Sequence, residues 1–135
     1  MKALIFFLCI CGFFSASAQK IQSNNYEITG YVKPDGTIQS STYQTVGYIK
    51  SDGKIQDNTY RIIGYVKSDG MIQDASYRTV GYVKSDGRVQ DASYRTLGYV
   101  KEDGTVQDAS YRTLGYAKGV NREWAAVVFF FFFFN

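Results

Sequence analysis

The chain has 135 residues, a length typical of one domain, and 45% of them are hydrophobic. Its formal net charge is only +3, which does not favour nucleic-acid binding. The absence of histidine removes the commonest general base of enzymes.

The stretch MKALIFFLCICGFFSASA (residues 1–18) has the three parts of a secretory signal peptide. Lys2 supplies the positive charge, residues 3–14 form the apolar run, and Ala16-Ser17-Ala18 is a small-residue cleavage site. A membrane anchor is the alternative, but the run is short for a spanning helix. We predict export across the inner membrane of a bacterium, giving a periplasmic, outer-membrane-associated or secreted protein. Cleavage removes both cysteines, so packing rather than disulfides must hold the fold.

Residues 19–118 are predicted to form a β-hairpin repeat domain with a period of 17. Gly-Tyr pairs recur at this spacing from Gly30 to Gly115, and Asp-Gly pairs recur from Asp35 to Asp103. In one unit YRTLGYVK (residues 94–101) is rich in strand-forming residues, and a turn (EDG), a return strand (TVQ) and a second turn (DAS) follow it. Such self-similarity is typical of stacked units that each bury one face against a neighbour.

The first turn of the earliest unit is Lys33-Pro34-Asp35-Gly36. Proline presets φ at the second turn position and glycine suits the left-handed position after it, so we predict a three-residue hairpin loop with a bulge.

Alternation along the long strand divides its side chains between two faces. Tyr94, Thr96, Gly98 and Val100 share an uncharged face, which we assign to the interior. The opposite face carries Leu97 and Tyr99 between charged residues, and burial of this pair is the alternative.

The array begins and ends on complementary halves of a unit. Residues 20–25 (KIQSNN) align with the second half, TVQDAS, and residues 111–118 (YRTLGYAK) repeat the first half. If the two halves pair, five complete hairpins become six and the array closes without exposed edges. We therefore predict an all-β fold, a closed ring or shallow barrel of about twelve strands, with an open stack as the alternative.

Residues 119–135 form a hydrophobic tail. Its apolar run from Trp124 to Phe134 is much shorter than the about 20 residues of a spanning helix. A twelve-strand ring is too wide to be filled by its own side chains, and a helix that is apolar on all sides is typically buried. We predict a helical core plug made of Trp124, Val127, Val128, Phe129, Phe130, Phe131, Phe132, Phe133 and Phe134. A membrane-inserted tail and a final strand are the alternatives.

The acidic residues have structural explanations in each repeat. The aspartates of the Asp-Gly turns suit turn formation. Asp57, Asp74, Asp91 and Asp108 each stand four residues before an arginine, which they can pair with, or they can cap backbone amides. Their spacing matches neither an EF-hand loop nor a glycine-rich calcium repeat. We expect no enzymatic activity, no metal and no cofactor.

What recurs around the ring is a candidate binding surface. A tyrosine row comprises Tyr31, Tyr48, Tyr65, Tyr82, Tyr99 and Tyr116. A lysine row comprises Lys33, Lys50, Lys67, Lys84, Lys101 and Lys118. An arginine row comprises Arg61, Arg78, Arg95 and Arg112. Tyrosine and lysine together suit an interface with lipid head groups, glycans or protein, whereas solvated strands with cross-strand tyrosine packing are the simpler alternative.

The period, the GYVKSDG hairpins and the WAAVVFFFFFF tail together resemble the β-flower proteins over residues 20–135. The architecture is also similar to Tubby C-terminal domains and their scramblase-like relatives, which are twelve-stranded closed barrels threaded by a hydrophobic C-terminal helix. Tubby-like domains bind phosphoinositide head groups, although their lipid-contacting residues cannot be placed on this sequence. Together with the poly-Phe tail, the Tubby-like architecture suggests that the exported module associates with a membrane surface or lipid head groups, through the lysine and tyrosine rows or a partly exposed tail. A secreted glycan-binding or adhesive repeat protein is the alternative, since the hairpins are also similar to choline-binding cell-wall repeats.

Overall fold

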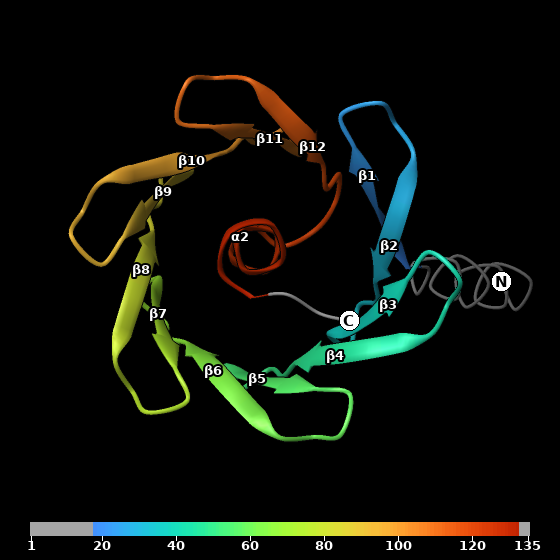
Figure 1. Cartoon of the computed structure of the whole chain (residues 1–135), viewed down its shortest axis with the longest axis horizontal. Helices are drawn as coiled ribbons and strands as arrows, with labels where there is room; N and C mark the ends of the chain where they lie inside the picture. The colour runs from blue at the N-terminus through green and yellow to red at the C-terminus, as the bar shows by residue number, and fades with distance from the viewer. Residues whose placement is uncertain (1–17, 133–135) are drawn as a thin grey trace, which may run out of the picture.

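Twelve short antiparallel strands surround one central helix (Figure 1). The computed structural model describes residues 18–132, so the predicted signal peptide lies outside the described residues except for Ala18. The strands are β1 (Gln19–Ser23), β2 (Ile28–Val32), β3 (Thr37–Ser40), β4 (Thr45–Ile49), β5 (Lys54–Asp57), β6 (Ile62–Val66), β7 (Met71–Asp74), β8 (Thr79–Val83), β9 (Arg88–Asp91), β10 (Thr96–Val100), β11 (Thr105–Asp108) and β12 (Thr113–Tyr116). They are followed by α2 (Arg122–Ala126) and a π-helix, η1 (Val127–Phe131).

Pairing of β1 with β12 closes the ring, as the two half-units at the ends of the array predict. Gln22 lies opposite Tyr116 and Ser23 lies opposite Gly115, while β1 also pairs with β2. Each described strand therefore has a partner on both sides, and the closed barrel presents no free strand edge.

The Asp-Gly turns have the predicted three-residue geometry. In the first, the N–H of Gly36 donates to the carbonyl of Lys33, and the N–H of Lys33 donates to the carbonyl of Thr37. Gly36 has φ +90°, and a Cβ there would lie 1.8 Å from the backbone oxygen of Ile49 in the neighbouring hairpin. Glycine is required both by the left-handed backbone and by this close approach. We call the end of the ring formed by these turns the crown.

A β-bulge in each long strand corrects the predicted faces. The register shifts between Thr96 and Gly98, so alternation does not continue through Leu97. Gly98 and Val100 are buried as predicted, but Tyr94 is 63% exposed and Leu97 packs against the core. The ladder is also shorter than the expected eight residues, because Tyr94 and Arg95 belong to the turn.

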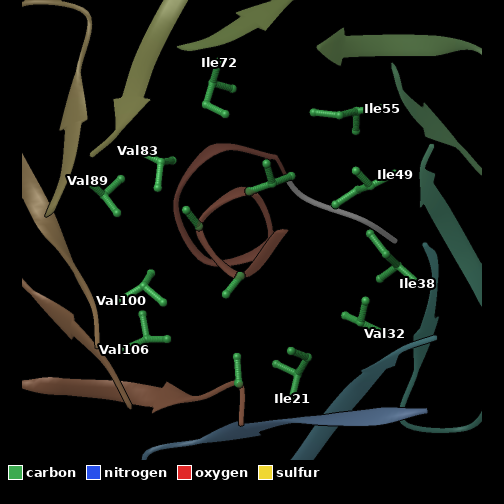
Figure 2. Packing of buried hydrophobic residues seen from close by; sticks show 14 residues of the cluster. Ile21, Val32, Ile38, Ile49, Ile55, Ile72, Val83, Val89, Val100 and Val106 are labelled. Atoms are coloured by element: carbon green, nitrogen blue, oxygen red, sulfur yellow. The ribbon is translucent and has the colours of Figure 1, made fainter. Parts of the chain in front are cut away.

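The core is a ring of valine and isoleucine side chains around the helix (Figure 2). Both strands of each hairpin contribute, and Ile49, Ile55, Ile72, Val89 and Val106 are fully buried. Ala125, Ala126 and Val127 bring the helix into this ring and are also fully buried. These contacts confirm the helical plug for the part of the tail that the structure describes. Phe133 and Phe134 lie outside the described residues.

A turn and a helix cap redirect the chain from β12, in the wall of the barrel, to the helix at its centre. Gly119 adopts φ +78° just after β12, and the N–H of Val120 donates to the carbonyl of Ala117. The Asn121 side chain then caps α2 by accepting a hydrogen bond from the N–H of Trp124 at 3.2 Å.

Successive phenylalanines of the plug meet successive glycines of the ring. Phe129, Phe130, Phe131 and Phe132 lie against Gly115, Gly98, Gly81 and Gly64, respectively. Six hairpins divide the circle into steps of about 60°, whereas an α-helix turns by about 100° per residue. The wider π-helical winding of η1 turns less per residue, which brings consecutive side chains closer to consecutive hairpins.

A methyl group at a ring glycine should therefore destabilise the fold. A Cβ on Gly98 would lie 2.2 Å from the backbone oxygen of Gln107 and 2.7 Å from the Phe130 ring. We expect Gly98→Ala to lower the free energy of unfolding by about 1–3 kcal/mol, measured by urea denaturation. Lys101→Ala, at an exposed crown position, is the control. Equal stability of the two variants would contradict the close fit.

Candidate functional site

The hairpin ends opposite the crown repeat the three-residue turn with tyrosine in place of glycine. In one of these tips the N–H of Tyr94 donates to the carbonyl of Asp91 at 3.0 Å, and the N–H of Asp91 donates to the carbonyl of Arg95 at 2.9 Å. Tyr94 consequently has φ +69°, a left-handed backbone that is uncommon for a bulky residue. The same conformation recurs in Tyr26, Tyr43, Tyr60, Tyr77, Tyr94 and Tyr111.

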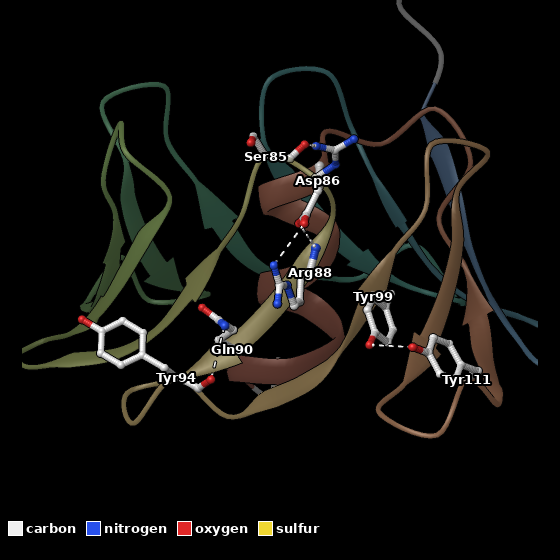
Figure 3. A network of polar contacts seen from close by, with 8 residues as sticks. Ser85, Asp86, Arg88, Gln90, Tyr94, Tyr99 and Tyr111 are labelled. Carbon is white, nitrogen blue, oxygen red and sulfur yellow. Dashed lines mark hydrogen bonds and ion pairs between the residues drawn. The ribbon is translucent and has the colours of Figure 1, made fainter.

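Each tip tyrosine stacks on a tyrosine of the predicted row, which belongs to an adjacent hairpin. The ring centroids are 4.6–5.0 Å apart, the ring planes differ by 9–14°, and the hydroxyl oxygens are 3.0–3.2 Å apart. Figure 3 shows one pair, Tyr99 with Tyr111. The pairs are Tyr31–Tyr43, Tyr48–Tyr60, Tyr65–Tyr77, Tyr82–Tyr94, Tyr99–Tyr111 and Tyr116–Tyr26. We call these six pairs the tyrosine rim.

Stability alone is a weak explanation for tyrosine at the tips. A left-handed backbone costs an L-residue about 1–2 kcal/mol, whereas an aromatic pair contributes about 0.5–1.5 kcal/mol beyond area burial. The two effects roughly cancel, and glycine would avoid the cost. Strained residues concentrate at functional sites. The tip tyrosines are also 61–65% exposed, so they present aromatic surface to solvent.

The charges at the tips neutralise one another in four hairpins. In one tip, Asp91 Oδ1 accepts from the N–H groups of Ser93 and Arg95, and Oδ2 accepts from the Arg95 Nε at 2.9 Å. Both predicted roles of these aspartates, capping and ion pairing, therefore occur together. The arginine row is 82–83% exposed. In the first two hairpins Ser23 and Ser40 cap the turn instead.

The lysine row lies where the strands enter the crown turns, away from the tips. Lys33, for example, directly follows β2, whereas Tyr26 precedes that strand. The rows meet in two places, where Lys50 and Lys118 lie over the rings of Tyr48 and Tyr116, with the nitrogens 5.8 and 5.9 Å from the centroids. The two rows are therefore neighbours along each long strand, with the lysines on the crown side of the tyrosines.

The tyrosine rim surrounds an apolar centre at the same end of the ring. The residues at the bulge position of the long strands, including Val46, Ile63, Val80 and Leu97, pack against the core while remaining half-buried, and Leu114 is 38% exposed. Phe129–Phe132 are also only half-buried. A hollow of about 210 Å³ at this end has a mixed lining, apolar from Ile21, Ile38, Val46, Val128 and Phe132 and polar from Thr29, Gln39, Ser40 and Tyr31.

Sequence reasoning missed the tip tyrosines and this centre. Strict alternation along the strand places these tyrosines on the interior face, and the bulge reverses that assignment. The available signal was the seventeen-residue recurrence of tyrosine directly after the second turn, at the place equivalent to the glycine of the first turn.

The crown holds three hollows between the start of the helix and the crown turns, and one of them is larger than the other two. It measures about 450 Å³ and is lined by Trp124, Glu123 and Asn121 of the helix start together with two crown turns. Arg122 and Ser85 line a neighbouring hollow of the crown, where the Arg122 side chain donates a hydrogen bond to the carbonyl of Ser85. Within residues 18–132, no three acidic side chains gather in a way that could hold a metal ion. No helix in this range has the length and apolar character needed to cross a bilayer.

The closed ring of hairpins with a hydrophobic helix at its centre defines an all-β, helix-plugged barrel. The chain belongs to the β-flower family, since the model of the family described as "5-fold beta-flower protein" matches residues 18–133. The described fold nevertheless contains twelve strands in six hairpins. Comparisons with curated proteins and with solved structures gave no match.

Substitutions at one tip separate backbone strain from stacking. Tyr94→Gly and Tyr94→Ala both remove the stack on Tyr82, but only alanine retains the left-handed penalty. We expect the alanine variant to be less stable than the glycine variant by about 1 kcal/mol in urea denaturation. Arg95→Ala and Arg95→Gly, at the next exposed position, serve as a matched pair in which this difference should not appear.

The stability of the fold should decrease at both low and high pH. Hydrogen bonds from the Thr59 hydroxyl and from backbone amides lower the pKa of Asp57 from 3.8 to about 2. A carboxylate with a lowered pKa stabilises the fold above its ordinary value, and this contribution is lost as pH falls through about 2. Hydrogen bonding to Tyr60 raises the pKa of Tyr48 above its ordinary value of 10.0, so its contribution is lost as pH rises through that raised value.

Thermal unfolding across pH tests these signs. Asp57→Asn should weaken the acid dependence, and Tyr48→Phe should weaken the alkaline dependence. Unchanged pH profiles in both variants would contradict these assignments.

Proposed function

We propose that this protein is an exported, non-enzymatic module that docks on a lipid surface through the tyrosine end of the ring. One observation carries the proposal, namely a half-buried apolar centre enclosed by twelve tyrosines. Tyrosine is enriched at membrane interfaces, where its ring meets apolar chains and its hydroxyl meets water.

Apolar groups at this end favour shallow insertion over a membrane crossing. Leu114 is 38% exposed, Ile28 is 37% exposed and Ile62 is 36% exposed, and the four phenylalanines are covered only in part. An apolar patch with a polar border is the arrangement expected of an interaction site. The surrounding tyrosines set the depth at which such a surface would rest.

The charge distribution indicates which lipids should bind. The arginines at the tips are already paired with aspartates, and the lysine row lies toward the crown. Apolar burial rather than attraction to anionic lipid should therefore supply the binding energy. Binding should extend to zwitterionic vesicles and depend only weakly on salt.

Glycan binding is a second candidate, and the exposure of the tip tyrosines favours it. One face of each tip ring covers its partner, yet 61–65% of the residue remains accessible. The ring therefore offers six equivalent aromatic platforms, each of which could contact the C–H face of a sugar. In four of them an arginine and an aspartate lie beside the tyrosine and can bond sugar hydroxyl groups.

Flotation with vesicles tests the lipid proposal directly. The chain from Gln19 onward should float with phosphatidylcholine vesicles at both low and high salt. Leu114→Glu places a charge in the apolar centre and should reduce partitioning about tenfold or more, which corresponds to at least about 1.4 kcal/mol. Ser68→Glu adds the same charge at the crown and should bind normally. The proposal fails if the unmodified chain does not float, or if both variants bind equally. Retention on a glycan array by that non-floating chain would support the second candidate.

A further inference from the structure

We propose that the six pairs of the tyrosine rim are modification sites at which a one-electron oxidant couples the two phenol rings. Coupling would join neighbouring hairpins by a carbon–carbon bond. The proposal is independent of the lipid-docking function, because it rests on the geometry within each pair rather than on an external ligand.

The two rings of each pair are prepositioned for this reaction. They are nearly parallel, with centroids 4.6–5.0 Å apart, but their hydroxyl oxygens are only 3.0–3.2 Å apart. The rings therefore converge toward their hydroxyl ends. The ring carbons next to the hydroxyls, which carry much of the unpaired spin of a phenoxyl radical, lie in this closer region.

An oxidant can reach each pair from solvent. The tip member is 61–65% exposed, whereas the inner member is half-buried between neighbouring hairpins. The turn and the stack hold both rings in place, so two radicals formed in one pair meet each other before they meet another molecule. This arrangement should favour coupling within a pair over coupling between chains.

The reaction balances with a peroxide as oxidant. Each tyrosine loses one electron and its phenolic proton, and the two radicals form one bond between the carbons beside the hydroxyls. Each of these carbons then loses its hydrogen as a proton while the phenol oxygen regains one. In total the pair loses two electrons and two protons, which reduce one hydrogen peroxide to two waters through a haem peroxidase.

One pair would seal the ring covalently. Tyr116 and Tyr26 lie 90 residues apart in sequence, and their stack spans the junction between β12 and β1. The other five pairs join residues only 12 apart. A link across the longer loop constrains the unfolded chain most, so this bond should contribute most to the gain in stability. Residues 18–132 contain no cysteine, so such bonds would be the covalent cross-links of this part of the chain.

The test is oxidation of the folded chain by horseradish peroxidase with hydrogen peroxide, followed by trypsin and mass spectrometry. Coupling of Tyr82 to Tyr94 joins the peptides of residues 79–84 and 89–95, with two hydrogens fewer than their sum. We expect this product and four more joined peptide pairs in monomeric protein whose melting temperature has risen. Tyr31 and Tyr43 share the tryptic peptide of residues 21–50, since Pro34 blocks cleavage after Lys33, so their coupling appears as a loss of two hydrogens within that peptide. The same treatment in concentrated urea should give mixed pairings and chain-to-chain products.

Tyr94→Phe provides the matched variant, because it keeps the stacked ring and removes one hydroxyl. It should lose the Tyr82–Tyr94 product alone and retain the other five. The proposal is overturned if folded protein yields mainly chain-to-chain products. It is equally overturned if the Tyr82–Tyr94 product forms to the same extent in urea, or if no coupling occurs within the pairs.

Discussion

The contact between the central helix and the wall of the ring is the constraint on which the rest of this structure depends. Twelve strands enclose a space that valine and isoleucine side chains cannot fill alone, so the wall requires an internal partner. Ala125, Ala126 and Val127 supply small buried side chains, and the phenylalanines that follow widen the plug toward the tips. A glycine in each hairpin leaves the space into which an aromatic ring or a neighbouring carbonyl fits.

The two ends of each hairpin use one turn geometry for different purposes. At the crown a Cβ would collide with the next hairpin, so Gly36 and its equivalents are required for closure. At the tips the hairpins are open to solvent and a side chain fits, so tyrosine occupies the same left-handed position. The stack with the adjacent hairpin offsets the backbone strain. The result is a crown specialised for packing and a rim specialised for exposed aromatic surface.

The helix breaks the symmetry of the ring. Six nearly equal hairpins surround a segment that cannot repeat with them, and the π-helical winding of η1 reduces this mismatch. The hollows of the crown differ in size, about 450 Å³ beside Glu123 and Trp124 and about 200 Å³ beside Arg122, because the helix start faces each crown turn differently. The tyrosine rim, by contrast, remains six-fold, as the proposed docking on a lipid surface requires of a surface with many equivalent contacts.

The sequence by itself determined the period, the Asp-Gly turns, the closure by two half-units and the central plug, because each depends on local turn chemistry or on composition. Only the tertiary structure decided which side chains face inward and which tyrosines pair. The bulge beside Leu97 interrupts alternation, so faces cannot be counted along the strand. The pairing of Tyr116 with Tyr26 depends on closure of the whole ring, which brings residues from its two ends into contact.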